Sequence, residues 1–248
     1  MMATASASRT PAGARSGSCA VSRQLRCCHA RALGAGDGWL GPDEVASLLS
    51  CYGIATLEQH VAATPAAAGR AAASLGLPVA VKAVAPDLVH KGAVGAVRTE
   101  LRSVAAARRA AAEVLEAARR AGHEPTGVLV QPMAPPGAEL LVGVVHDQLF
   151  GAVVACGAGG SLVEVVHDVE VRLAPLSTPE VDALARSPIV ARLISRAGAS
   201  EAAVGDVLRR VSALADAHPE IAELDLNPLV ASPAGVIAVD ARVRVELR

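Results

Sequence analysis

Aromatic side chains are nearly absent from this sequence of 248 residues, which contains one Trp, one Tyr and one Phe. Hydrophobic residues still make up 52% of the chain, so its core has to be built from Ala, Val and Leu, and small side chains favour close packing of helices on sheets. No run of about 18 apolar residues occurs, so no membrane span is expected. The five cysteines form no CxxC pair. This usage indicates free thiols in a reducing, cytoplasmic setting rather than a zinc or disulfide framework.

A strong charge of either sign is also missing, because the net charge is only −1. This balance argues against a nucleic-acid partner. The charge is unevenly spread, since residues 1–36 hold five of the 23 basic residues and none of the 24 acidic ones. This opening is rich in Ser, Ala, Gly and Arg and shows little apolar periodicity. We expect residues 1–40 to be a disordered extension and residues 41–248 to form the folded domain.

Lysine and asparagine are scarce as well. The chain has 21 arginines but only two lysines, Lys82 and Lys91, and a single asparagine, Asn227. Arginine can replace lysine wherever charge alone matters, so lysine should persist where a compact ammonium group is needed. The three scarce residues therefore mark candidate sites.

Periodicity and capping residues predict a mixed chain of helices and strands. Several strands follow one another without an intervening helix, which excludes a simple doubly wound sheet and favours an α+β fold of two subdomains, the first at about 41–127. Helices are predicted over 42–49, 65–75, 103–121, 179–186, 188–196 and 201–217. Strands are predicted over 54–61, 79–82, 94–101, 127–131, 139–146, 150–155, 222–230 and 235–243, with a flexible loop at 156–161.

The two lysines occur in chemically suggestive surroundings. Lys82 ends the apolar strand Pro-Val-Ala-Val-Lys, where it can point its charge rigidly into a cleft; a strand-end lysine that meets solvent is the alternative. His90 and Lys91 form a pair in a loop followed by glycines. An imidazole can act as a nucleophile toward phosphorus, and an ammonium group can neutralise phosphoryl oxygens. Taken alone, such a pair is more often a solvated surface feature.

Two further segments are candidates for binding phosphate and metal. The run Gly157-Ala-Gly159-Gly160 follows an apolar strand, and its backbone N–H groups could cradle phosphates, although an ordinary turn fits too. In a strand over 222–230, the period of two puts Glu223, Asp225 and Asn227 on one face. Three oxygen-bearing side chains suit Mg²⁺, which also takes oxygens from phosphates; a polar edge before a Pro turn is the alternative.

The order of these motifs resembles the ATP-grasp domain of ADP-forming acyl-CoA synthetases over residues 43–245. The matching segments are Tyr52-Gly-Ile, Pro78-Val-Ala-Val-Lys82, Pro86-Asp-Leu-Val-His90-Lys91, Val128-Leu-Val-Gln131 with Met133, Gly137-Ala-Glu139-Leu, Phe150-Gly-Ala-Val-Val, Gly157-Ala-Gly-Gly160, Val171-Arg172-Leu-Ala-Pro-Leu, Glu223-Leu-Asp-Leu-Asn-Pro-Leu and Val239-Asp-Ala-Arg.

The resemblance implies an ATP-grasp fold, in which two α+β subdomains clamp ATP or ADP, and it implies a role for each motif. His90 and Lys91 would be catalytic, with His90 carrying the phosphoryl group. The nucleotide would be bound by Lys82, Val130, Gln131, Met133, Glu139, Gly159, Gly160 and Arg172. Mg²⁺ would be bound by Asp225 and Asn227. The CoA-binding subunit would be a separate chain, from which His90 receives its phosphate.

Two alternatives stay open at this point. An ATP-dependent carboxylate ligase of the same fold would work through an acyl phosphate and would not need His90. A non-catalytic nucleotide-binding module of a protein acyltransferase system is the second, because the acidic residue that the family usually has after His-Lys is replaced here by small residues such as Ala93.

Overall fold

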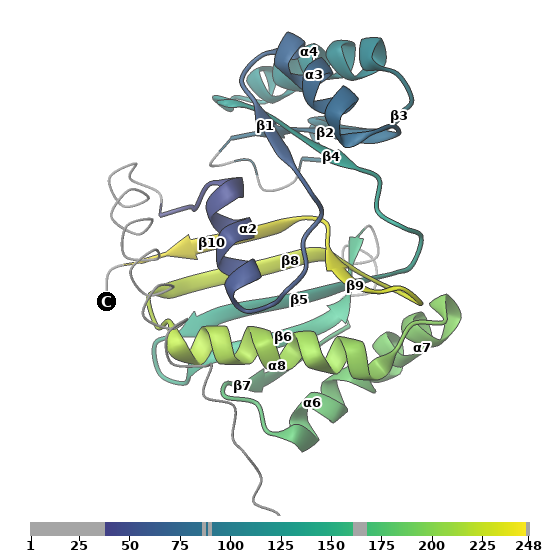
Figure 1. Ribbon diagram of the computed structural model, residues 1–248. Coiled ribbons are helices and arrows are strands. Elements are labelled where there is room, and N and C mark those ends of the chain that lie inside the picture. The colour runs from purple at the N-terminus through teal and green to yellow at the C-terminus, as the bar shows by residue number, and fades with distance from the viewer. Residues whose placement is uncertain (1–37, 86–87, 89–90, 161–167, 247–248) are drawn as a thin grey trace, which may run out of the picture.

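The computed structural model describes residues 38–85, 88, 91–160 and 168–246, and it contains two separate sheets with helices packed on each (Figure 1). The small sheet has the strand order β1-β4-β2-β3, and the large sheet has the order β10-β8-β5-β6-β7, with β9 paired to β8. The strands of both sheets pair antiparallel throughout the described residues. The expected ATP-grasp-like α+β arrangement of two subdomains is therefore present.

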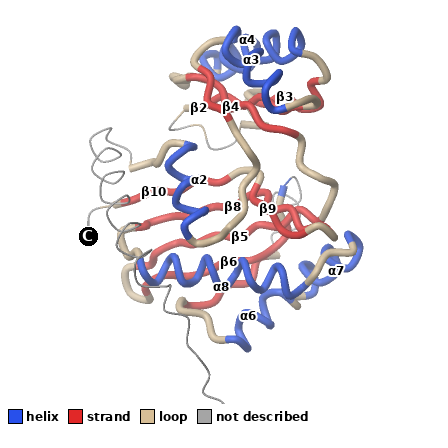
Figure 2. Tube along the Cα trace, viewed as in Figure 1, coloured by secondary structure: helices blue, strands red, loops and turns tan. Residues whose placement is uncertain are grey.

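The small subdomain is one continuous stretch of chain. Its strands are β1 (His60–Ala62), β2 (Val79–Val84), β3 (Val97–Leu101) and β4 (Gly127–Pro132), and its helices are α3 (Pro65–Leu75) and α4 (Val104–Arg120). The Ser103 hydroxyl accepts a hydrogen bond from the Ala106 N–H, which caps α4 and explains where the helix begins. Both helices cover the side of the small sheet that faces away from the large one (Figure 2).

The large subdomain contains the rest of the described chain. Its strands are β5 (Ala138–Asp147), β6 (Gly151–Ala158), β7 (Val169–Leu173), β8 (Ile221–Ser232), β9 (Gly235–Ala238) and β10 (Ala241–Val245), and its helices are α2 (Pro42–Cys51), α6 (Thr178–Ala185), α7 (Pro188–Ala197) and α8 (Glu201–Ala217). Alternate residues of β5, β6 and β8 pack against these helices in one core. The opposite face of the large sheet, which we call the open face, carries the polar side chains of β8.

The position of α2 differs from the expected division of the chain. Leu40, Val45, Leu48, Leu49 and Ile54 all belong to the core of the large sheet, although the sequence assigned residues 41–127 to the first subdomain. The segment before α2 is held there by backbone hydrogen bonds from Leu40 to Val243 and from Val245 to Gly38. Residues 38–40 are thus part of the fold, whereas residues 1–37 of the expected extension lie outside the described residues.

The predicted elements agree best where the local signal is strong. The helices at 65–75 and 201–217 have the predicted bounds. The strand predicted at 54–61 is wrong before His60, because residues 55–57 instead form hydrogen bonds to Ala238 of β9. The loop predicted at 156–161 is wrong over 156–158, since β6 continues to Ala158.

Two other differences concern strands. The strand predicted at 235–243 is two strands, β9 and β10, separated by Val239 and Asp240, and β7 was not predicted. No helix among the described residues is both long and apolar enough to cross a membrane.

Candidate active site

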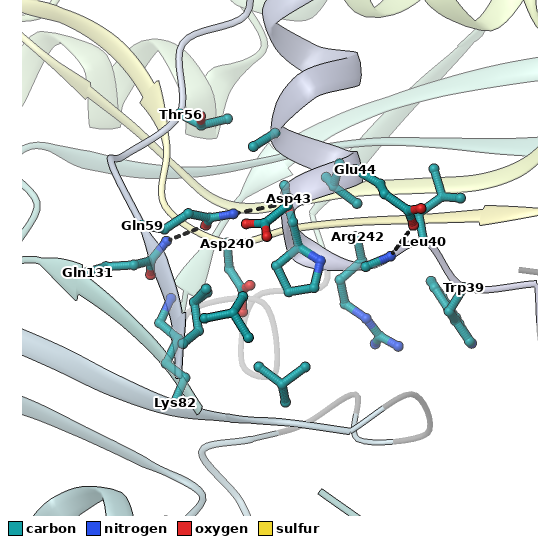
Figure 3. Close-up of a pocket in the computed structure, with 18 of the residues that line it drawn as sticks. Trp39, Leu40, Asp43, Glu44, Thr56, Gln59, Lys82, Gln131, Asp240 and Arg242 are labelled. Carbon is teal, nitrogen blue, oxygen red and sulfur yellow. Dashed lines mark hydrogen bonds between the residues drawn. The ribbon is translucent and has the colours of Figure 1, made fainter. Parts of the chain in front are cut away.

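The two sheets face each other across a cleft that contains a cavity of about 690 Å³. The small sheet contributes Lys82, Leu129 and Gln131 to its lining, and the large subdomain contributes the segment 239–242 and the start of α2. Figure 3 shows Lys82, Gln131 and Asp240 converging from the two sides. Side chains from both subdomains are needed to complete this site.

Lys82 reaches across the cleft from the centre of the small sheet. In β2 it alternates with Val81 and Ala83, which face α3 and α4, so its own side chain faces the large subdomain. Only 7% of the residue is exposed, and its Nζ donates a hydrogen bond to the Val239 carbonyl at 3.2 Å. Burial lowers the pKa of Lys82, while the nearby Asp240 carboxylate opposes that shift. A buried ammonium group at this position is well suited to bind a phosphate.

Lys91 joins Lys82 at the same carboxylate. Its Nζ lies 3.0 Å from Oδ2 and 3.2 Å from Oδ1 of Asp240. The turn that follows Lys91 is closed by a hydrogen bond from the Ala96 N–H to the Lys91 carbonyl. Burial alone would raise the pKa of Asp240, but Lys82 and Lys91 outweigh it and hold that pKa below its ordinary value. His90, the predicted phosphate carrier, lies outside the described residues.

The oxygen-bearing residues of β8 lie close to this carboxylate. Glu223, Asp225 and Asn227 alternate with the buried Leu224 and Leu226, as the period of two predicted. Burial, followed by the negative charges of Asp240 and Glu223, raises the pKa of Asp225 to about 6. The Asn227 backbone N–H donates to the Asp240 carbonyl at 3.0 Å. Two segments, β8 and the turn before β10, thus converge on one acidic position.

The chemistry of this position can be compared with what a divalent cation requires. No group of three or more His, Cys, Asp or Glu residues with metal-binding geometry occurs among the described residues. Asp225, Asp240 and the Asn227 amide carry oxygens that could serve as ligands, and the pKa of Asp225 is raised by burial first and then by the neighbouring Asp240 and Glu223 carboxylates. Mg²⁺ takes few protein oxygens and completes its shell with water and phosphate oxygens.

The glycine pair after β6 is fixed tightly between two site residues. The Gly159 N–H donates to the Glu139 carbonyl at 2.9 Å, and the Gly160 N–H donates to Asn227 Oδ1 at 2.8 Å. Gly160 has a φ of +59°, and a Cβ built there would lie 1.7 Å from Glu139 Oε2. Glu139, Gly159, Gly160 and Asn227 are therefore brought together, as expected for residues of one site.

Val130 and Arg172, which were also predicted to bind the nucleotide, do not lie beside these residues. The Val130 side chain belongs to the core of the small subdomain, and its backbone lies between β1 and β2. Arg172 pairs in register with Val154, which faces the helices, so its side chain lies on the helix-covered face away from the cleft. There it contacts Glu170 at 3.0 Å. The structure thus directs neither side chain into the cleft, and a nucleotide contact of either residue stays a prediction.

Gln131 and Met133 have partners within the protein. Gln131 is 3% exposed, and its Nε2 donates to Gln59 Oε1 at 3.1 Å and to the Val239 carbonyl at 3.2 Å. Its Oε1 is buried without a hydrogen-bond partner. The Met133 N–H donates to the Pro78 carbonyl. Gln131 therefore helps to hold the two subdomains together, and its buried oxygen remains available as an acceptor.

Sequence reasoning missed two residues of this site. Asp240 is the acceptor for Lys91 and the main charge near Lys82, and its signal was present in the motif Val239-Asp-Ala-Arg. Gln59 bridges Gln131 and the Pro42 carbonyl at the start of α2. No motif pointed to Gln59, because its partners are 17 and 72 residues away.

A small and a large antiparallel sheet, with lysines on one and oxygen ligands on the other, define a nucleotide-binding protein of the ATP-grasp class. Comparison with known proteins agrees, since a family described as an ATP-grasp domain matches residues 31–245. The chain belongs to this family, and its order of motifs matches the ATP-grasp subunits of ADP-forming acyl-CoA synthetases.

Individual relatives support that assignment. The beta subunit of acetate–CoA ligase [ADP-forming] I from Pyrococcus furiosus is 34% identical over 208 residues, which cover 81% of this chain and 89% of that subunit. Acetate–CoA ligase [ADP-forming] I from Archaeoglobus fulgidus is 36% identical over 79% of this chain but only 29% of that longer protein. A chain of the acetyl-coenzyme A synthetase 1 of Ca. Korarchaeum cryptofilum, solved with coenzyme A and Ca-AMPCP, superimposes with a TM-score of 0.82 at 35% identity. That match covers 91% of this chain and 100% of the other.

Proposed function

We propose that this chain is the nucleotide-binding subunit of an ADP-forming acyl-CoA synthetase and that it transfers a phosphoryl group between His90 and ADP. The overall reaction is acyl-CoA + ADP + phosphate ⇌ carboxylic acid + CoA + ATP. In the step assigned to this chain, the P–N bond to His90 breaks while a P–O bond to the β-phosphate of ADP forms. The observation that carries the proposal is the meeting of Lys82 and Lys91 with Asp240 beside Asp225 and Asn227.

In this step the cationic residues and the oxygen-bearing residues would have different roles. Phosphoryl transfer depends mainly on positioning and on neutralising the phosphoryl oxygens. Lys82 and Lys91 supply two ammonium groups that the Asp240 carboxylate and the Val239 carbonyl hold in place. Asp225, Asn227 and Asp240 would hold Mg²⁺, whose charge would neutralise phosphate oxygens of the nucleotide. The Gly159–Gly160 turn, fixed on Asn227, would offer backbone contacts to phosphates.

A separate CoA-binding subunit is the second part of the proposal. The P. furiosus relative is named as a beta subunit, and this chain corresponds to 29% of the A. fulgidus protein, which leaves most of that protein without a counterpart here. The Korarchaeum enzyme has been solved with a phosphorylated phosphohistidine segment and, in another structure, with that segment pointing towards the nucleotide-binding site. By similarity, His90 would carry phosphate between the partner subunit and the nucleotide.

The test is transfer of phosphate from γ-labelled ATP to the purified protein in the presence of Mg²⁺. We expect an acid-labile, base-stable label on the wild-type chain and none on His90→Ala. His60→Ala is the matched control, because His60 is half exposed in β1 and should leave labelling intact. An unlabelled wild-type chain that still binds ATP, and stays unlabelled when the CoA-binding subunit is added, would refute the relay.

The same variants separate the two other functions of this fold. A carboxylate ligase working through an acyl phosphate would retain its activity in His90→Ala, which trapping of the acyl phosphate with hydroxylamine would reveal. A regulatory module would bind nucleotide with no phosphorylated intermediate in either form. Both results contradict the proposed relay, and each identifies a different replacement for it.

A further inference from the structure

Strand β7 forms one edge of the large sheet and lies far from the cleft in sheet order. It pairs with β6, and no other strand among the described residues pairs with it. In Figure 1 it runs along the lower border of the sheet, beyond α8 and beside α6. Edge strands present unpaired N–H and C=O groups, and proteins usually protect them with charges, prolines or bulges. The sequence of β7 is Val-Glu-Val-Arg-Leu, which contains no proline, and its pairing with β6 shows no register shift.

The hydrogen-bond pattern shows which groups face outward. The Ala174 N–H donates to the Ala152 carbonyl at the end of this ladder. Because antiparallel pairs alternate between bonded and non-bonded positions, Arg172 and Glu170 direct their N–H and C=O groups toward β6. The backbone groups of Val169, Val171 and Leu173 therefore point away from β6. The Val171 carbonyl accepts a hydrogen bond from Arg172 Nη1 at 2.7 Å, so the Arg172 side chain would have to release it for another strand to bind there.

The same three residues expose their side chains on the open face. Val169 is 40% exposed, Val171 53% and Leu173 50%. Val145 of β5 extends this apolar strip across the sheet at 60% exposure, because Val145 and Leu173 both pair with Val153. Exposed apolar residues that adjoin one another along an unpaired strand indicate a surface that another chain covers.

The charged residues of β7 indicate that the covering chain is a second copy. Glu170 and Arg172 project from the opposite, helix-covered face and are both about one-third exposed, with 3.0 Å between Arg172 Nη2 and Glu170 Oε2. If two β7 strands pair antiparallel about an axis at Val171, Glu170 of each strand lies opposite Arg172 of the other. Directly opposite residues of unlike charge stabilise an antiparallel pair. On the other face, Val171 meets Val171 and Val169 meets Leu173, so the strand is complementary to itself on both faces.

We infer that two copies of this chain associate through β7, pairing antiparallel about a two-fold axis at Val171 so that their large sheets become continuous. Residues 169, 171 and 173 lie at hydrogen-bonded positions of the new ladder, which are the positions whose backbone groups point away from β6. Such an interface is isologous, as two-fold dimers require. The cleft and its lysines are not part of this surface, so the inference does not depend on the proposed phosphoryl transfer.

The test is sedimentation velocity of the full chain over a wide range of concentration. Wild type should sediment as a dimer. Glu170→Arg and Arg172→Glu, made singly, place like charges opposite each other, so each should raise the dimer dissociation constant at least about tenfold. The double variant Glu170→Arg/Arg172→Glu exchanges the two charges and should restore the dimer. A wild-type monomer at every concentration, or a dimer that both single variants leave unchanged, would overturn the inference.

A second pair of variants guards against loss of folding. Val171→Lys should abolish the dimer, since it places two ammonium groups opposite each other at the axis. Val104→Lys is the matched control, because Val104 is 38% exposed at the start of α4 in the small subdomain, and it should remain dimeric. All variants should keep the wild-type circular dichroism spectrum and unfolding temperature measured on monomeric samples at low concentration. If Val104→Lys also dissociates the dimer, the interface lies elsewhere and the inference fails.

Discussion

The core of the small subdomain and the core of the large one are built from different side chains. Alanine dominates the first, with Ala68 and Ala72 of α3 packed against Ala107 and Ala111 of α4. Leucine, valine and isoleucine dominate the second, where α8 alone buries Leu208 and Leu214 completely. Buried alanines allow helices to pack closely in the small subdomain, whereas the large subdomain fills its core with bulkier side chains.

The cleft faces of the two subdomains differ in charge as well. The small subdomain presents Lys82 and Lys91, and the large one presents Asp240, with Asp225 close to that carboxylate. Neither set alone can bind both a phosphate and its metal ion. The difference shows that the site is an interface between two bodies, so its properties depend on how they meet.

The largest effect should come from opposite kinds of substitution in the two cores. Leu208→Ala should lower the free energy of unfolding by about 2–5 kcal/mol, because it leaves a cavity in a fully buried position. In the small subdomain, enlargement should be harmful instead, and Ala111→Leu should cost about 1–3 kcal/mol by overpacking. Urea unfolding followed by circular dichroism measures both. A tolerated Ala111→Leu would mean that the small core is loosely packed and would remove this difference.

Removing one cation from the small subdomain is the next prediction. Lys82→Met keeps the aliphatic stem but removes the buried ammonium group, so the rate of His90 labelling should fall about 10²–10³-fold. The labelling rate should be measured at saturating ATP, which separates the chemical step from nucleotide affinity. Arg70→Met removes a cation from the exposed side of α3 and should leave the rate unchanged. Equal losses in the two variants would show that the effect arises from overall charge and not from the cleft.

A third test concerns the turn that links Gly160 to Asn227. Gly160→Ala puts a Cβ against the Glu139 carboxylate in a left-handed conformation, which costs about 1–2 kcal/mol for an L-residue. Nucleotide affinity should therefore fall about tenfold in calorimetry. Gly205→Ala in α8 is the control, since its added Cβ lies in the helix-facing core and meets Val181 at 3.2 Å, which a small shift of that side chain relieves without touching the turn. If Gly160→Ala binds the nucleotide with unchanged affinity, this turn does not contact the nucleotide.

The smallest effect is the pH dependence of the oxygen ligands. Because the pKa of Asp225 is raised to about 6, Mg²⁺ affinity should weaken by up to about tenfold per pH unit below that value. In Asp225→Asn, measured at each pH with the same nucleotide, this part of the pH dependence of Mg²⁺ affinity should disappear. If Mg²⁺ affinity depends on pH equally in wild type and Asp225→Asn, the titrating group belongs to the nucleotide and not to Asp225.

The same shift affects stability in the absence of metal. The folded protein holds the Asp225 proton more tightly than the unfolded chain does, so its stabilising contribution is complete below pH 3.8 and is lost as pH rises through about 6. Between these values the unfolding temperature of the metal-free wild type should fall relative to that of Asp225→Asn. A parallel pH profile for the two proteins would contradict the raised pKa.

Local patterns predicted the parts of this protein that local interactions determine. Ser103 and Ser200 cap helices whose start follows from the sequence, and the alternation of Glu223, Asp225 and Asn227 follows from the strand period. Local patterns could not predict the role of Asp240, because that role depends on Lys91, which is 149 residues away. Arg172 was placed in the site by its motif alone, whereas the register of β7 turns it to the opposite face. β7 itself escaped prediction because a five-residue edge strand has too short an alternation to stand out.

The chain passes between the two subdomains only twice among the described residues, once at 57–60 and once at 133–137. The first passage is bonded to β9 through Ala238 and to Pro42 through Gln59, and Gly137 at the second lies so near Ala231 that a Cβ there would be 2.4 Å from its carbonyl oxygen. A rigid body attached at two tight points keeps one easy degree of freedom, rotation about the line that joins them. Such a rotation would change the distance from Lys82 and Lys91 to Asp240, so one angle would set the width of the cleft.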